Sequence, residues 1–275
     1  LSYAALGQGF LFEAWMLSSS GTCASRGYQG PGDIVAFSFW GGFRAYSAAS
    51  CGTKAINVCN VSDVACVDMV TDTATGALVV TLVGGSDCSM ITCTVKTIYD
   101  KASVLDVTDT VIAERPILKT NCIGSLACGQ CVGAVHSLRS SGTLNTPQPL
   151  SLSAVAERTG NFSTQQSIID AINNSENQAL RFGSVNAAWV QVFFGTVVAG
   201  GAVDSAFHAM QGVANNTTSS FSVDGSTTTG TTGPSSGTGS VMSICDNGAF
   251  MGTGLLGYVG EAGLIVGHTF SGGEV

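Results

Sequence analysis

Ser219-Ser220-Phe221-Ser222-Val223-Asp224-Gly225 is the stretch of sequence that decides the fold class. Polar and apolar side chains alternate up to Val223, and alternation with a period of two is typical of a strand with one buried face. An Asp-Gly step follows directly, which is a strong signal for the tight turn of a β-hairpin. The stretch therefore predicts a strand at 219–223 that turns back on an antiparallel neighbour.

Similar strand-like runs recur along the chain, with turn residues between them. They lie at 33–39, 77–83, 93–99, 150–157, 188–194, 206–214, 241–244 and 255–266. One segment, 163–173, has a helical pattern, with Ser163 as its cap and Ile168, Ile169 and Ile172 as an apolar stripe. Many strands with almost no helix predict an all-β fold, namely an antiparallel β-sandwich (jelly roll) with one short helix and an N-terminal arm.

The domain organisation follows from composition. The run 225–240 is nearly all Gly, Ser and Thr, but we expect a long surface loop rather than a linker, because strands flank it on both sides. Residues 30–275 are therefore predicted to form one domain. Residues 1–29 are apolar without a basic start and fit neither a signal peptide nor a membrane span. We expect an arm that packs on a neighbouring molecule, with a first strand of the same domain as the alternative.

Charge is sparse and acidic. The 275 residues include 10 Lys and Arg against 18 Asp and Glu, with a net charge of −8, a pI near 4.6 and a mean hydropathy of +0.35. Without a basic cluster there is no electrostatic basis for binding nucleic acid or an anionic membrane. Few surface charges also favour assembly with other copies of the chain, since surface charge is what usually keeps a monomer soluble.

Ten cysteines predict a disulfide-rich protein of an oxidising, extracellular environment. Three pairs are close in sequence, so we predict three local bridges: Cys59 with Cys66, Cys88 with Cys93, and Cys122 with Cys128. The pairing of Cys23, Cys51, Cys131 and Cys245 stays open among three connectivities, including bridges between subunits.

A metal site is the competing interpretation of the cysteines. Cys128-Gly129-Gln130-Cys131 is a C-x-x-C motif, which binds zinc or does redox chemistry in other proteins. No second such motif accompanies it, and His136, His208 and His268 are widely separated. We therefore predict neither a metal site nor a cofactor.

The order of several short motifs resembles a known family. Gly30-Pro31-Gly32-Asp33-Ile34, then Arg44-Ala45-Tyr46-Ser47, then 88–93 followed by Thr97-Ile98-Tyr99-Asp100 is similar to the N-terminal domain of fungal-type α-L-arabinofuranosidase B. Later motifs at 207–209, 222–225 and 257–262 resemble the wider concanavalin A-like, laminin G-like jelly-roll family, which includes domains on bacteriophage particles. The resemblance covers roughly residues 30–275 and implies the same sandwich fold.

The resemblance also allows a test for catalysis. A retaining glycosidase needs two carboxyl groups about 5–5.5 Å apart. The family's acid/base lies in an Asp-Asn step, which Asp246-Asn247 resembles. Its nucleophile is a Glu on a central strand, where this chain reads Trp189-Val190-Gln191-Val192-Phe193-Phe194 without a carboxylate. The family's adjacent cysteine pair is missing too, so we expect Asp246 to be a turn residue and predict no catalytic residue.

Other catalytic patterns are weak. The Gly-x-Ser-x-Gly match at 233–237 lies in the low-complexity run and not between a strand and a helix. Glu261 lies within an apolar strand, where a carboxylate needs a partner. We expect it to pair with Arg115 or Arg158, with membership of a functional site as the alternative.

Two functional hypotheses follow. The first is a non-catalytic structural or adhesive protein of an extracellular particle, a phage virion, which contacts other copies or other particle proteins through residues 1–29 and binds a cell-surface glycan. The alternative is a secreted carbohydrate-binding or glycoside hydrolase-like, arabinofuranosidase-related domain. Sugar binding would use aromatic faces and polar side chains, and Trp189 is set aside as a core residue. The predicted sugar-binding residues are Trp40, Tyr46, Asp246, Asn247 and Tyr258.

Overall fold

The hairpin that the sequence predicts at Asp224-Gly225 is present in the computed structural model. Strand β15 (Ser219–Val223) pairs antiparallel with β16 (Ser226–Gly230), and Val223 lies opposite Ser226. The two turn residues have positive φ values, 49° at Asp224 and 81° at Gly225. This is the combination that a two-residue turn of type I′ requires.

The structure describes residues 22–160, 166–172, 180–185, 188–193, 196–234, 237–245 and 254–270. Within them the pairs between named strands are all antiparallel. No helix in this described part has the length and apolarity that a bilayer crossing requires.

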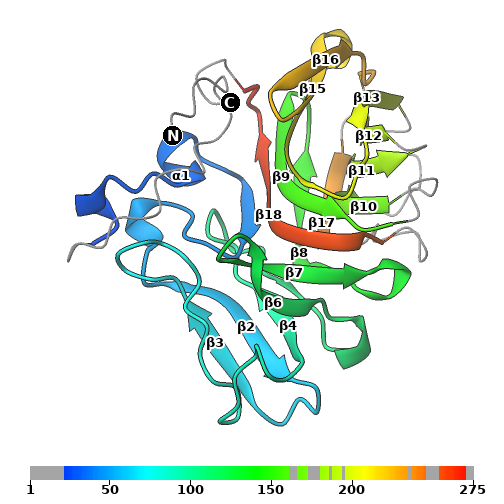
Figure 1. The fold of residues 1–275 in the computed structure, drawn as a ribbon. Coiled ribbons are helices and arrows are strands. Elements are labelled where there is room, and N and C mark those ends of the chain that lie inside the picture. The colour runs from blue at the N-terminus through cyan, green and yellow to red at the C-terminus, as the bar shows by residue number, and fades with distance from the viewer. Residues whose placement is uncertain are drawn as a thin grey trace, which may run out of the picture.

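The first sheet has the strand order β16–β15–β14–β9–β18–β1. β18 and β9 run side by side through the middle of the molecule (Figure 1). The bounds are β14 Phe207–Ala214, β9 Leu150–Arg158, β18 Leu256–Val266 and β1 Phe39–Gly42, with β7 Leu126–Val132 and β6 Ile117–Ile123 continuing beyond the start of β18.

The second sheet has the order β13–β12–β11–β10–β17–β8–β5–β4–β2–β3 and is joined to the first where β4 pairs with β6. Its bounds are β13 Thr196–Ala202, β12 Ala188–Phe193, β11 Leu180–Val185, β10 Gln166–Ile172, β17 Gly237–Ile244, β8 Leu138–Thr146, β5 Val107–Thr108, β4 Cys93–Ile98, β2 Lys54–Asn60 and β3 Cys66–Val70. The helical elements are α1 Pro31–Ile34 and the 3-10 turns Ala24–Arg26, Ala48–Ser50, Ile112–Glu114, Gly133–Val135 and Asn216–Thr218.

The hydrophobic core lies between the sheets. One face of the first sheet contributes Leu152, Ala154 and Phe221, and the second sheet contributes Ile169 and Ile244, all of them buried. Full burial of a large apolar side chain stabilises the fold by about 1.5–3 kcal/mol. The all-β sandwich that the sequence predicts is confirmed.

All ten cysteines are paired. The three predicted local bridges are present, and the other four cysteines pair as Cys23–Cys51 and Cys131–Cys245. Both halves of the C-x-x-C motif are therefore oxidised in separate bridges. Five disulfides with no free thiol are typical of an extracellular protein.

The predicted helix at 163–173 is wrong, because residues 166–172 form strand β10. Ile168 and Ile169 are both fully buried, and the pairing with β11 shifts register between Ser167 and Ile169. Ile168 is the extra residue at this shift, and both isoleucines are covered by packing against the rest of the core, which overrides the apparent helical stripe. The one α-helix among the described residues is the four-residue α1.

Two predicted strands near the N-terminus are also wrong. In 33–39 the first two residues belong to α1, where Pro31 starts the helix and the Asp33 carboxylate accepts the Gly30 N–H at 2.9 Å. The run 77–83 forms isolated bridges only, from Ala77, Leu78 and Val83.

The run 225–240 is more ordered than the predicted loop. It contains all of β16 and the start of β17. Threonine supplies much of β16, and its β-branched side chain favours extended backbone.

Part of the predicted arm belongs to the body of the domain. Cys23 is buried and bonded to Cys51, and its N–H donates to the Thr73 carbonyl at 2.6 Å. Residues 1–21 lie outside the described part, so contact of the arm with a neighbouring molecule stays a prediction.

Candidate functional site

The face of the first sheet that points away from the core carries several polar side chains, and we call it the polar face. Because paired residues in an antiparallel sheet point to the same side, its members follow from the register. Tyr258, Glu157 and Phe207 form one row across β18, β9 and β14. The next rows are Glu261, Val155 and Ala209, and then Gly263, Ser153, Gln211 and Ser222, with Trp40 of β1 opposite Gly263.

A groove of about 40 Å³ lies in the middle of the polar face. Its polar lining comes from five strands and one hairpin turn, which are distant in sequence and meet only through the sheet register. These lining residues include Trp40, Ser153, Gln211, Ser222, Asp224 and Glu261. A groove of this volume admits a group of the size of one or two water molecules.

Two side chains that line the groove carry an N–H donor with no hydrogen-bond partner among the described residues. The indole Nε1 of Trp40 and the amide Nε2 of Gln211 are both buried and unpaired. The two side chains are only 1% and 8% exposed, so solvent does not satisfy them. An unpaired buried donor costs about 1–3 kcal/mol, which a ligand with acceptor oxygens would recover.

Glu261 and Arg44 form an ion pair beside the groove. Arg44 Nη2 donates to Glu261 Oε1 at 2.8 Å, and Arg44 Nε donates to the other carboxylate oxygen. Burial lowers the pKa of Arg44, but the charge of Glu261 more than offsets this effect and raises the pKa overall. The expected partners Arg115 and Arg158 were wrong. Arg44 lies just beyond the end of β1, the strand that pairs with β18. Because Arg44 and Glu261 are far apart in sequence, their contact could not be predicted without this pairing.

Tyr28 lies beside this pair. Its hydroxyl hydrogen-bonds to the Ala45 carbonyl at 2.5 Å. Burial, partly offset by Arg44, raises the pKa of Tyr28 to about 12. This hydroxyl therefore stays protonated at physiological pH and acts as a structural donor.

Carboxylates gather at the end of the polar face near Glu157. Burial raises the pKa of Glu157, and the neighbouring charge of Asp204 raises it further. The pKa of Asp204 is lowered instead, chiefly by its hydrogen bond with His208. Opposite shifts in neighbouring carboxyl groups are a common feature of sites that transfer protons.

His208 connects two loops at the same end. Its Nδ1 lies 2.6 Å from Asp224 and its Nε2 lies 2.9 Å from Asp204. Burial lowers the pKa of His208, but hydrogen bonds with Asp224 and Asp204 outweigh that effect and raise it. The imidazole ring packs edge-on against buried Trp189, with centroids 5.6 Å apart.

The predicted sugar-binding residues are only partly brought together. Trp40 and Tyr46 are neighbours, with ring centroids 6.0 Å apart, but Trp40 is buried and has no exposed ring face. Tyr258 lies elsewhere on the polar face, beside Phe207. Asp246 and Asn247 lie outside the described residues. Gln211, Glu157 and Phe207 were missed, because no local motif marks them and only the register across three strands aligns them.

The region of the family's nucleophile forms strand β12. Its described residues, 188–193, contain no carboxylate. Any acid chemistry in the described part of this chain therefore has to come from other carboxyl groups.

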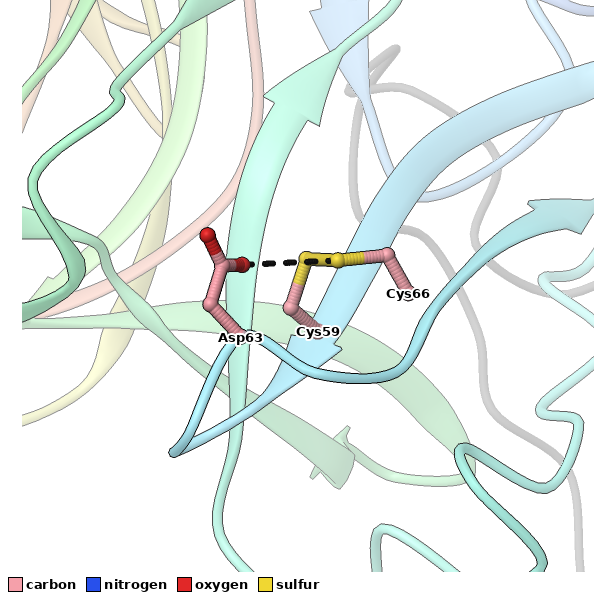
Figure 2. Close-up of side chains that lie close together, drawn as sticks. All are labelled: Cys59, Asp63 and Cys66. Atoms are coloured by element: carbon pink, nitrogen blue, oxygen red, sulfur yellow. Dashed lines mark hydrogen bonds between the residues drawn. A yellow bond between two sulfur atoms is a disulfide. The ribbon is translucent and has the colours of Figure 1, made fainter.

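One cluster has the spacing of metal ligands in the described part of the chain: Cys59, Asp63 and Cys66. Figure 2 shows that the two sulfurs are joined in a disulfide, with an Asp63 oxygen 3.4 Å from the Cys66 sulfur. A disulfide leaves no thiolate to bind a metal. Asp63 instead pairs with Arg115 at 2.8 Å, so the cluster stabilises the β2–β3 hairpin.

Comparisons with known proteins identify relatives of the fold. No protein-family model matches the chain, and no curated protein matches it. A GH54 α-L-arabinofuranosidase soaked with a cyclic sulfate inhibitor matches with a TM-score of 0.64 and 15% identity, over 88% of this chain and 62% of that chain. An arabinofuranosidase complexed with arabinofuranosyl-α-1,2-xylobiose matches with a TM-score of 0.61 and 14% identity, over 90% of this chain and 63% of that chain. A Glu-to-Gln mutant of a GH54 α-L-arabinofuranosidase soaked with 4-nitrophenyl α-L-arabinofuranoside matches with a TM-score of 0.62 and 14% identity, over 88% of this chain and 62% of that chain.

These matches confirm the resemblance to arabinofuranosidases and correct the main functional expectation. The expectation of a non-catalytic structural protein of a phage particle was wrong, and so was the expectation that the chain is not an enzyme. The chain shares its fold with glycoside hydrolases instead. At 15% identity the likeness shows the fold alone. The chain spans 62% of the length of the first of these proteins.

Proposed function

We propose that this chain is a secreted, glycoside hydrolase-like domain that binds a neutral glycan on its polar face. The observation that carries the proposal is the pair of unpartnered buried donors, Trp40 Nε1 and Gln211 Nε2, at the groove. Buried polar groups are nearly always satisfied in native proteins, so unsatisfied donors in a groove point to a ligand with acceptor oxygens.

A sugar suits this groove because hydroxyl groups both accept and donate hydrogen bonds. The two N–H groups offer donors, and the carboxylates of Asp224 and Glu261 offer acceptors. Among the described residues that line the groove none carries a positive charge. With a net charge of −8, the chain would repel a sulfated or uronic acid-rich glycan, so the ligand class is neutral.

Calorimetric titration with arabinofuranosyl-xylobiose tests the proposal. We expect saturable binding that weakens about tenfold in Trp40→Phe, because one hydrogen bond to the sugar is lost. Trp189→Phe is the matched control, since Trp189 is equally buried and also has an unpaired indole N–H but does not line the groove. Absence of binding, or an equal effect of the two substitutions, would overturn the proposal.

Hydrolysis is the second candidate function, favoured by the opposite pKa shifts of Glu157 and Asp204. In this role protonated Glu157 donates its proton to the departing glycosidic oxygen, and ionised Asp204 accepts a proton from the attacking water. Release of 4-nitrophenol from 4-nitrophenyl α-L-arabinofuranoside measures the reaction. Glu157→Gln should abolish release, and wild-type release should decline as pH rises through the raised pKa of Glu157. Undiminished release by Glu157→Gln excludes this assignment.

A further inference from the structure

Phe207 and Tyr258 form an aromatic pair at the edge of the polar face, outside the groove. Phe207 lies opposite Glu157 on one side and Tyr258 lies opposite it on the other. The ring centroids are 6.1 Å apart with the planes tilted by 41°, so the rings lean toward each other across β9. Both side chains are partly exposed.

The aromatic pair is aligned with the groove along β9. Glu157 is two residues from Val155 and four from Ser153, both of which line the groove. With a rise of about 3.3 Å per residue, the row of the aromatic pair lies about 7–13 Å along the strand from the groove. This separation matches neighbouring units of one glycan chain rather than two hydroxyls of a single sugar.

The chemistry of the pair differs from that of the groove. Partly exposed rings offer apolar surface for the C–H face of a sugar, and Glu157 between them offers an acceptor for its hydroxyls. The Tyr258 hydroxyl has no hydrogen-bond partner in the described part of the chain, so it adds a free donor. The groove, in contrast, combines a largely apolar lining with two side chains that carry buried, unpaired N–H groups.

We infer that the glycan spans both features, so that the ligand is an oligosaccharide with a hydroxyl group of one unit in the groove and the next unit over Phe207 and Tyr258. This inference rests on the proposed function, since it requires a sugar in the groove. It defines the substrate class as a short neutral oligosaccharide rather than a single terminal sugar.

The experiment compares methyl α-L-arabinofuranoside with arabinotriose by calorimetric titration. Wild-type protein should bind the trisaccharide about tenfold more tightly, from the added stacking on two rings. The double variant Phe207→Ala/Tyr258→Ala should lose this gain and keep its affinity for the monosaccharide. Tyr258→Phe should keep most of the gain, because it retains the ring, and it serves as the matched control for folding.

The outcomes separate the inference from the function that it extends. Equal wild-type affinity for both sugars, or a gain that survives in the double variant, overturns the extended site and leaves the groove intact as a sugar site. Failure of wild-type protein to bind either sugar removes the proposed function and the inference together. Trp40→Phe should weaken the binding of both sugars equally, since the substitution changes the groove and not the aromatic pair.

Discussion

Single residues on the polar face have structural roles beside the ligand-binding roles that we propose for them. Trp40 illustrates the difference between prediction and structure. The sequence singled it out for its aromatic face, but the ring is buried, its backbone N–H donates to Asp100 at 2.9 Å, and its indole N–H has no partner among the described residues. The residue type alone suggests that an aromatic side chain could bind sugar. Which part of its ring is accessible depends on tertiary packing, which the sequence does not show.

The Arg44–Glu261 pair gives a stability prediction. The two side chains are only 16% and 10% exposed, so removing one charge leaves the other buried and unpaired. Glu261→Gln should lower the free energy of unfolding by about 3 kcal/mol, measured by urea denaturation. The double variant Arg44→Met/Glu261→Leu should recover most of this loss, since neither charge remains. A cost of only about 0–1 kcal/mol for Glu261→Gln is the value typical of exposed pairs and would contradict the burial.

The raised pKa of His208 predicts how the stability of the protein depends on pH. Its raised pKa means that its contribution to stability is complete below the ordinary His pKa of about 6.5 and is lost as pH rises through the folded-state value. The lowered pKa of Asp204 means that this carboxylate contributes above the ordinary Asp value of about 3.9 and loses its contribution at lower pH.

The stability difference between wild type and His208→Gln should therefore be largest at about pH 4–6.5 and small at pH 9. Urea titrations at a series of pH values measure it. His136→Gln is the control of opposite sign, because burial lowers the pKa of His136 and its charged form is disfavoured in the fold. A pH-independent difference for His208→Gln contradicts the bridging role of its charged form.

At the scale of elements, the β15–β16 hairpin places Asp224 at the groove. Gly225 has a φ of 81°, and no atom lies within 4 Å of the position that a Cβ would take, so a side chain there has space but an unfavourable backbone. Gly225→Ala should destabilise the protein by about 1–2 kcal/mol. Gly201→Ala is the matched control, since its Cβ would also meet nothing within 4 Å and its φ is not positive. Equal thermal stability of the two variants would contradict the assigned turn.

Strand elements with a local signature were predictable from sequence, whereas those defined by their neighbours were not. Leu150–Arg158, Phe207–Ala214, Ser219–Val223 and Leu256–Val266 follow the predicted runs within a residue or two. The helix at 163–173 was mispredicted because two adjacent buried isoleucines fit a helical stripe as well as a buried strand with a register shift. The polar face has no signature in any one strand, since each contributes only one to three of its residues.

At the scale of the whole molecule, the disulfides differ in what they constrain. Cys59–Cys66 joins positions 7 residues apart in one hairpin, whereas Cys131–Cys245 joins positions 114 residues apart, at β7 and just beyond β17. The local pairs could be predicted from spacing, but the long one depends on how the two sheets meet.

Loop-closure entropy then gives an ordering of stabilities. Replacing Cys131 and Cys245 by Ser should cost roughly 5 kcal/mol, and replacing Cys59 and Cys66 should cost roughly 2 kcal/mol. Urea denaturation of the two double variants under non-reducing conditions measures both. A larger cost for the hairpin bridge would contradict this ordering.

The central claim is that the polar face binds a neutral glycan through the buried indole N–H of Trp40. The most direct measurement is a titration of ¹⁵N-labelled protein with arabinofuranosyl-xylobiose, following the indole N–H signals of its three tryptophans by NMR. The account predicts a saturable shift of the Trp40 signal while the Trp189 signal stays in place. A Trp40 signal that stays unchanged at saturating sugar would contradict it.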